Sequence, residues 1–202
     1  MNDRNALDIS VLICTFNRAG SLRETLESLA EADRGNLSVE VVVIDNNSSD
    51  RTREVAEAFS ERIRIRILTQ SRPGKIHSLN HALDVGGLGA LVVLLDDDMS
   101  VHPGWFQGVK SISNRHPDCD YFTGRTILSW PDCEVPAWAH HRFLRPWAFS
   151  FIDYGDQDVA VKPGQWLSGN HYWFRSKVLE DGRRFLDFWN SESNFTLQMA
   201  EE

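Results

Sequence analysis

Short apolar runs recur at intervals through the first hundred residues of the chain. Three of them are mostly apolar and have the length of strands that are buried on both faces: 9–15, 39–44 and 90–95, of which 90–95 is apolar throughout. A fourth run, 63–67, alternates isoleucine with arginine, a pattern typical of a half-exposed strand. The pattern therefore predicts four strands in this part of the chain.

The segments between these runs carry apolar residues at helical spacing. Residues 22–29 repeat leucine in this way, and Ser21 with Glu24 has the pattern of a capping box at the start of that helix. Asp50 is predicted to cap a second helix, and a third is expected over 76–85. Strands that alternate with helices predict an α/β protein with a Rossmann-like, mostly parallel central sheet flanked by helices.

Polar residues follow three of the predicted strands directly: 15–18, 45–48 and 96–98. In open α/β sheets, ligands bind beyond the carboxyl ends of the parallel strands. The polar side chains are therefore expected to meet at one edge of the sheet and to form the site there.

The second half of the chain has a different pattern. Prolines interrupt an aromatic-rich stretch from about 125 to 165, and all but one of the seven tryptophans lie at or after position 130. We expect long loops and short strands that lie over the carboxyl edge of the sheet. The chain, 1–202, is predicted to form one domain, with a ligand-binding half over about 1–106 and a smaller half over about 107–202.

Composition and charge exclude some classes of function. The formal net charge is −8, which argues against nucleic-acid binding because that function requires a basic face. Three cysteines without CxxC spacing favour a reducing compartment. No apolar run is long enough to cross a membrane, and the N-terminus lacks the pattern of a leader. We expect a cytoplasmic protein, with peripheral contact at the inner membrane surface left open.

The acidic triplet Asp96-Asp97-Asp98 follows an apolar strand without a gap. Two unit charges about 4 Å apart repel each other by roughly 1 to 4 kcal/mol, depending on screening. A bound divalent cation converts this repulsion into coordination, and oxygen ligands suit Mg²⁺ or Mn²⁺. The alternative is an acidic loop that is simply solvated. The position at the end of a strand favours the metal.

The order and spacing of several short motifs resemble the family-2 glycosyltransferases of the GT-A fold. The matching elements are Thr15-Phe-Asn-Arg18, Asp45-Asn-Asn-Ser-Ser-Asp50, Gly74-Lys75 with Leu79-Asn80, and Asp96-Asp-Asp98 followed by Pro103. The resemblance implies a metal-dependent enzyme that moves a sugar from a nucleoside-diphosphate sugar to an acceptor hydroxyl. The acceptor would be a sugar, a lipid-linked molecule or a small molecule.

The resemblance also implies a role for individual residues. Thr15 and Asp45 would contact the nucleoside, although Thr15 could simply end a strand and Asp45 could cap a turn. Lys75 would lie near the diphosphate. The donor site would be completed by Asn17, Arg18, Asn47, Asn80, Asp96 and Asp97, of which Asn80 could equally bond backbone groups inside the fold. Asp98 would bind the metal directly, together with Asp96.

The acceptor side matches the family less closely. Gly169, Asn170 and Trp138 are the candidate acceptor residues. The family usually places Glu-Asp at the start of a later helix, with the aspartate as base, whereas this chain has Glu192-Ser193. Glu192 is therefore the candidate base for an inverting transfer, and Asp187 is its rival.

Three alternatives are weighed against this interpretation. A nucleotidyltransferase or an NAD-dependent enzyme would show a glycine-rich loop after the first strand, and residues 15–20 do not form one. A degenerate domain that binds a nucleotide sugar without transferring it remains the non-enzyme alternative. A histidine could add a further metal ligand, but a surface or structural role is favoured for each candidate: His140, His141 and His171.

Overall fold

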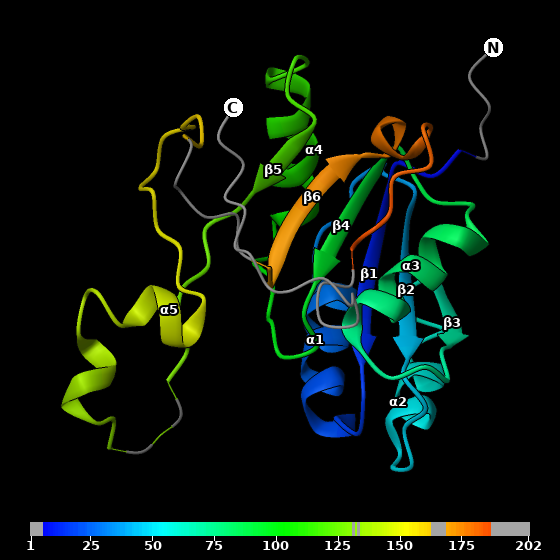
Figure 1. The fold of residues 1–202 in the computed structure, drawn as a ribbon, viewed down its shortest axis with the longest axis horizontal. Coiled ribbons are helices and arrows are strands. Elements are labelled where there is room, and N and C mark those ends of the chain that lie inside the picture. The colour runs from blue at the N-terminus through cyan, green and yellow to red at the C-terminus, as the bar shows by residue number, and fades with distance from the viewer. Residues whose placement is uncertain (1–5, 131, 133, 163–168, 187–202) are drawn as a thin grey trace, which may run out of the picture.

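A six-stranded sheet forms the centre of the computed structural model, which describes residues 6–130, 132, 134–162 and 169–186 (Figure 1). The strands lie in the order β3-β2-β1-β4-β6-β5. Their bounds are β1 Ile9–Thr15, β2 Val39–Asp45, β3 Ile65–Thr69, β4 Leu91–Leu95, β5 Tyr121–Thr123 and β6 His171–Arg175.

Four neighbouring strands, β3, β2, β1 and β4, run parallel. β6 pairs antiparallel with both β4 and β5. The four strands expected from the apolar pattern are all present, and the mostly parallel α/β sheet is confirmed. β3 begins at Ile65 because Ile63 packs into the core just before it, and the strand itself is mostly half-buried as expected.

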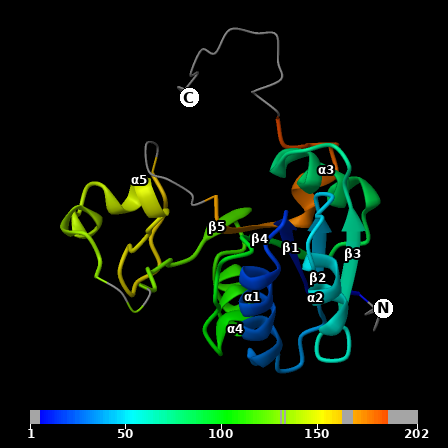
Figure 2. The same cartoon turned by 90° about the horizontal axis from the view of Figure 1, so that it is seen from below.

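Helices cover both faces of the sheet, as two views of the chain show (Figure 2). The helices between the strands are α1 Ala19–Glu31, α2 Thr52–Ala58, α3 Lys75–Val85 and α4 Trp105–Arg115. Alternate side chains of a strand point to opposite faces. Val11 of β1 therefore packs in the core with α1, α2 and α4, whereas its neighbour Leu12 packs in the core with α3.

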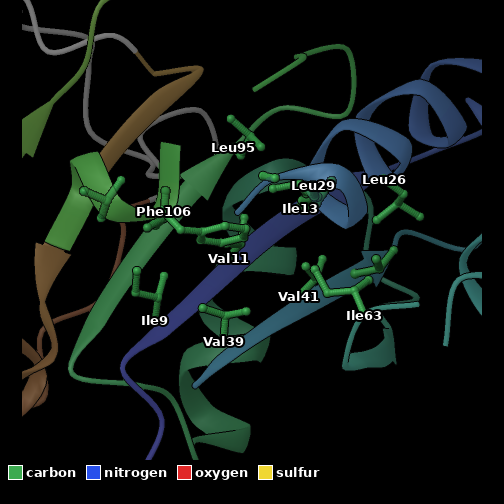
Figure 3. Close-up of a cluster of buried hydrophobic side chains, with 14 of the residues drawn as sticks. Ile9, Val11, Ile13, Leu26, Leu29, Val39, Val41, Ile63, Leu95 and Phe106 are labelled. Carbon is green, nitrogen blue, oxygen red and sulfur yellow. The ribbon is translucent and has the colours of Figure 1, made fainter. Parts of the chain in front are cut away.

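The larger core lies on the face covered by α1, α2 and α4 (Figure 3). There Ile13 of β1 and Leu95 of β4 meet Leu26 and Leu29 of α1 and Phe106 of α4. All five side chains are buried. Burial on both faces explains why β1, β2 and β4 are mostly apolar in the sequence, whereas the half-buried β3 alternates.

The start of α1 differs from the expected capping box. The helix begins at Ala19, two residues before Ser21, so Ser21 lies inside it and does not cap it. The amide of Ala19 instead donates to the carboxylate of Asp50 at 3.2 Å. The same carboxylate accepts from the amide of Thr52 at 3.0 Å, but the N-cap of α2 is Arg51, so Asp50 lies one residue before the capping position that the sequence predicted for it.

The aromatic-rich stretch forms an excursion that leaves the sheet after β5. It contains the 3₁₀ helix η1 Ala137–His140 and the short helix α5 Arg145–Phe149, and a bridge between Thr126 and Ile152 closes its base. Both views place it to the side of the β5 edge (Figures 1 and 2). The expectation that it lies over the carboxyl edge of the sheet is therefore wrong.

After β6 the chain forms the 3₁₀ helix η2 Ser176–Leu179. Within the described part of the chain, no helix is both long and apolar enough to span a membrane.

Candidate functional site

The expected cluster of polar side chains lies at the carboxyl edge of the parallel strands. β1 ends at Thr15, β2 ends at Asp45, and Asp96 follows β4. β6 is antiparallel to β4, so its first residue lies at this same edge. The amide of Asp96 donates to the carbonyl oxygen of Asn170 at 3.0 Å, which joins the acidic triplet to the start of β6.

The acidic triplet is held by two cations that come from distant parts of the chain. Nη1 of Arg18 donates to Asp97 at 2.8 Å and to Asp98 at 2.9 Å. These two carboxylates hold the pKa of the Arg18 guanidinium above its usual range. The side chain of Asp97 is 7% exposed and that of Asp98 is 50% exposed, so the pair with Asp98 is open to water.

The second cation, Lys75, is the first residue of α3. Its ammonium contacts the carboxylate of Asp96 and donates to the carbonyl oxygen of Gly169 at 3.0 Å. A positive charge at a helix N-terminus is unfavourable for the helix dipole. The Asp96 carboxylate offsets this effect and aims the ammonium at the sheet edge.

These groups surround a cavity of about 240 Å³ at the carboxyl edge. Five of the predicted donor residues line it: Thr15, Arg18, Lys75, Asp96 and Asp97. Four further lining residues were not predicted: Cys14, Phe16, Asn46 and Ser78.

Two of the missed residues stand inside the matching motifs, and the other two lie close to them in the sequence. Phe16 follows Thr15 and exposes 55% of its surface, so its ring is available for stacking at the cavity. Ser78 lies three residues after Lys75, on the same side of α3. The hydroxyls of Thr15 and Ser78 are buried, and neither has a hydrogen-bond partner among the described residues.

Asn46 shapes the approach to Lys75. Its side-chain amide donates to the carbonyl oxygens of Gln70 and Arg72, at 2.7 and 2.8 Å, and its oxygen accepts from the amide of Gly74 at 2.8 Å. These three bonds hold the loop between β3 and α3 against the end of β2. Asn46 therefore places the N-terminus of α3 beside the cavity.

Two of the expected donor residues hold the loop that follows β2. Asn17, in a left-handed conformation (φ 51°), accepts from the amide of Ser49 at 2.7 Å. Asp45 accepts from the amide of Ser48 at 2.9 Å. It therefore caps a turn, the alternative that the sequence offered to contact with the nucleoside. Neither side chain lines the cavity, and nor does Asn47, which is exposed and also left-handed (φ 65°).

Asn80 bonds backbone groups inside the fold, which is the alternative to a role in the donor site. Its side-chain nitrogen donates to the carbonyl oxygen of Phe185 at 2.8 Å, and its oxygen accepts from the amide of the same residue at 2.9 Å. Both ends of the amide are thus engaged. Asn80 joins the chain after η2 to α3 and does not line the cavity.

The three candidate acceptor residues lie in two different parts of the structure. Gly169 and Asn170 lie at the site, through their bonds to Lys75 and Asp96. Trp138 lies in η1, in the excursion beside the sheet. The two candidate bases, Glu192 and Asp187, fall outside the described residues.

His171 has a structural role. It is buried, its Nε2 accepts from Nε1 of Trp105 at 3.0 Å, and its ring packs at 5.6 Å from that of Trp173. Gly124 packs so closely that a Cβ there would lie 2.4 Å from the imidazole. Burial lowers the pKa of His171 to about 4, so the ring is neutral near pH 7.

Cys14 lies at the cavity as a neutral thiol. Burial raises its pKa to about 12, against the opposing effect of Lys75. A thiol with so high a pKa is not a nucleophile near pH 7. The cavity therefore offers carboxylates, cations and hydroxyls for binding, and no activated cysteine.

The donor set at the triplet suits a divalent ion that binds together with a phosphate ligand. Among the described residues, no three histidine, cysteine, aspartate or glutamate side chains are grouped as a metal site. Mg²⁺ and Mn²⁺ prefer oxygen ligands, and Mg²⁺ typically takes one or two protein carboxylates and completes its shell with water and phosphate oxygens. Asp98, which is half-exposed, and Asp96, two residues earlier, supply carboxylates of that kind.

Comparison with known proteins shows the family. The model of the family described as glycosyl transferase family 2 matches residues 10–178, and the chain belongs to this family. Glycosyltransferase AglE of Haloferax volcanii is 30% identical over 61% of this chain and 41% of its own length. The dolichol-phosphate mannosyltransferase of Pyrococcus furiosus is 26% identical over 62% of this chain and 36% of its own.

Solved structures confirm the GT-A fold. TarS 1-349 of S. aureus in complex with UDP has a TM-score of 0.62 and 20% identity, over 87% of this chain and 48% of its own. The mannosyltransferase PcManGT of Pyrobaculum calidifontis, in complex with GDP-Man and Mn²⁺, has a TM-score of 0.60 and 21% identity, over 91% of this chain and 49% of its own. The chain thus spans less than half the length of these relatives.

Proposed function

We propose that this chain is the donor-binding part of a glycosyltransferase that moves a sugar from a nucleoside-diphosphate sugar to an acceptor hydroxyl. The observation that carries the proposal is the cavity at the carboxyl edge, where the carboxylates of Asp96 and Asp97 meet the cations Arg18 and Lys75. Asp98 does not line the cavity and is joined to it through its ion pair with Arg18. The two cations can bind the oxygens of a diphosphate, and the exposed ring of Phe16 can stack on a nucleotide base.

In the proposed reaction the acceptor oxygen bonds to the anomeric carbon while the bond from that carbon to the diphosphate oxygen breaks. The hydroxyl proton passes to a carboxylate base, and the anomeric centre inverts. Arg18 and Lys75 stabilise the charge that develops on the diphosphate. A divalent ion at Asp98 and Asp96 would supply further positive charge there.

A panel of nucleotides tests the proposal. We expect one of UDP, GDP, dTDP and CDP, with Mn²⁺, to raise the thermal midpoint of the chain, because a ligand that binds only the native state stabilises it. At about a hundred times its dissociation constant the gain is roughly 2.7 kcal/mol. No response to any nucleotide would contradict donor binding. Binding without slow hydrolysis of the matching nucleotide sugar would instead favour a binding module.

Asp45 gives a second prediction, that its carboxylate contacts the nucleoside. Asp45→Asn keeps an oxygen that can accept from the amide of Ser48, so the loop after β2 should stay in place. We expect this variant to bind the nucleoside diphosphate about 10- to 100-fold more weakly, the worth of a charged hydrogen bond. Inorganic diphosphate should bind unchanged in calorimetry. An equal loss for both ligands would mean that Asp45 only supports the site.

A further inference from the structure

The excursion beside β5 has a charge pattern unlike that of the rest of the chain. From Val135 to Ile152 there is no aspartate or glutamate, while Arg142 and Arg145 give the stretch a charge of +2. The whole chain carries −8. The same stretch holds five aromatic side chains of Trp and Phe type. Residues 135–152 are therefore cationic and rich in aromatic residues, although Asp132 and Glu134 just before them leave the whole excursion, 126–152, without net charge.

Three large apolar side chains between residues 137 and 149 face solvent. Phe143 is 62% exposed, Trp138 is 55% exposed and Leu144 is 45% exposed. They are held in place: the Trp138 ring stacks on Phe149 at 5.8 Å, and the Arg142 guanidinium lies 4.3 Å from the Phe143 ring centroid. The side chains are therefore presented to solvent on an ordered frame of η1, α5 and the turn between them.

Two arginines of this surface, the exposed Arg142 and the half-buried Arg145, have no carboxylate partner among the described residues. At the base of the excursion, Arg125 pairs with Asp153 at 2.9 Å and with Asp156 at 3.0 Å. Arg142 and Arg145, by contrast, form no ion pair with any described residue, and Arg145 stacks on Phe151 at 4.2 Å. Positive charge is therefore concentrated beside the exposed aromatic rings.

We propose that this surface, formed by residues 137–149, docks on an anionic phospholipid membrane. Arginine beside aromatic rings suits the headgroup region, where the rings enter the interface and the cations meet phosphates. The hydroxyls of a glycan donate as well as accept, and residues 135–152 contain no Asp, Glu, Asn or Gln whose side-chain oxygen could accept from them. Docking would hold the sheet edge near an acceptor in the membrane. The proposed membrane binding does not depend on which nucleotide sugar the chain binds.

Vesicle flotation of the chain without nucleotide tests the proposal. We expect binding to phosphatidylglycerol-containing vesicles at least about tenfold tighter than to pure phosphatidylcholine, and weaker at high salt because salt screens the charges. Arg142→Gln should weaken binding about fivefold. Phe143→Ser should weaken it about tenfold or more, because the ring no longer enters the interface. Arg51→Gln is the matched control, since Arg51 is exposed on the loop before α2 and should not matter.

Hydrogen exchange supplies a measurement that needs no variant. Anionic vesicles should slow amide exchange within 137–149 in the unaltered chain. The proposal is overturned by equal binding to both kinds of vesicle, by no binding, or by full binding of both variants. It is also overturned if a soluble oligosaccharide, and not the vesicles, protects 137–149. A failure of the chain to bind nucleotides would not change the result of these vesicle experiments. It would contradict only the proposed donor site.

Discussion

Asp98→Ala should abolish the metal dependence of nucleotide binding while leaving the fold intact. The carboxylate is half-exposed, and its partner Arg18 also bonds the nearly buried Asp97 at 2.8 Å, so the pair of Arg18 with Asp97 should survive. Loss of an outer-shell partner costs a metal site about 10- to 100-fold in affinity, and loss of a direct ligand should cost at least as much. Calorimetry of UDP or GDP binding, with and without Mn²⁺, measures the effect.

A matched variant separates metal binding from loss of charge. Asp84→Ala also removes one exposed carboxylate, which pairs with Arg184 far from the triplet, and should keep the response to Mn²⁺. Both variants should unfold within about 0.5 kcal/mol of the parent chain, because exposed ion pairs contribute little to stability. Unchanged Mn²⁺ dependence in Asp98→Ala would show that this carboxylate only holds Arg18.

The second large effect is expected at Glu192, the candidate catalytic base. Glu192→Gln should leave donor and metal binding intact and lower turnover at least about a hundredfold, because general-base help is worth roughly 10² to 10⁴ in rate. The next residue, Ser193, cannot replace a carboxylate since a hydroxyl is not basic enough at neutral pH. Steady-state transfer rates, measured with the donor that the nucleotide panel identifies, give the size of the loss.

Asp187→Asn is the matched test of the rival. If Glu192 is the base, the Asp187 variant should transfer sugar at the normal rate. The reverse result, normal turnover in Glu192→Gln and loss in Asp187→Asn, would assign the base to Asp187. A similar loss of nucleotide binding in either variant would indicate damage to the donor site and not removal of a base.

Local pattern alone predicted four of the six strands and the edge of the sheet at which polar residues gather. The mostly apolar runs at 9–15, 39–44 and 90–95 became β1, β2 and β4, because a strand buried on both faces is largely apolar. Glu40 is the charged exception in β2, where it is buried and pairs with Arg64 and Arg66. The polar residues after them met at one edge, because parallel strands bring their carboxyl ends together. Four residues that the motifs predicted, Thr15, Lys75, Asp96 and Asp97, therefore line one cavity, whereas their roles in binding a donor remain a proposal.

Only the tertiary structure decided which polar groups meet. Arg18 bonds carboxylates 79 and 80 residues away, and Asn80 bonds the backbone of a residue 105 positions later. The start of α1 depended on Asp50, and the excursion stands beside the sheet, although the sequence predicted that it would cover the edge. Apolar periodicity records which face of an element is buried. The partner of a polar side chain is instead set by how distant elements pack, and this packing leaves no local period in the sequence.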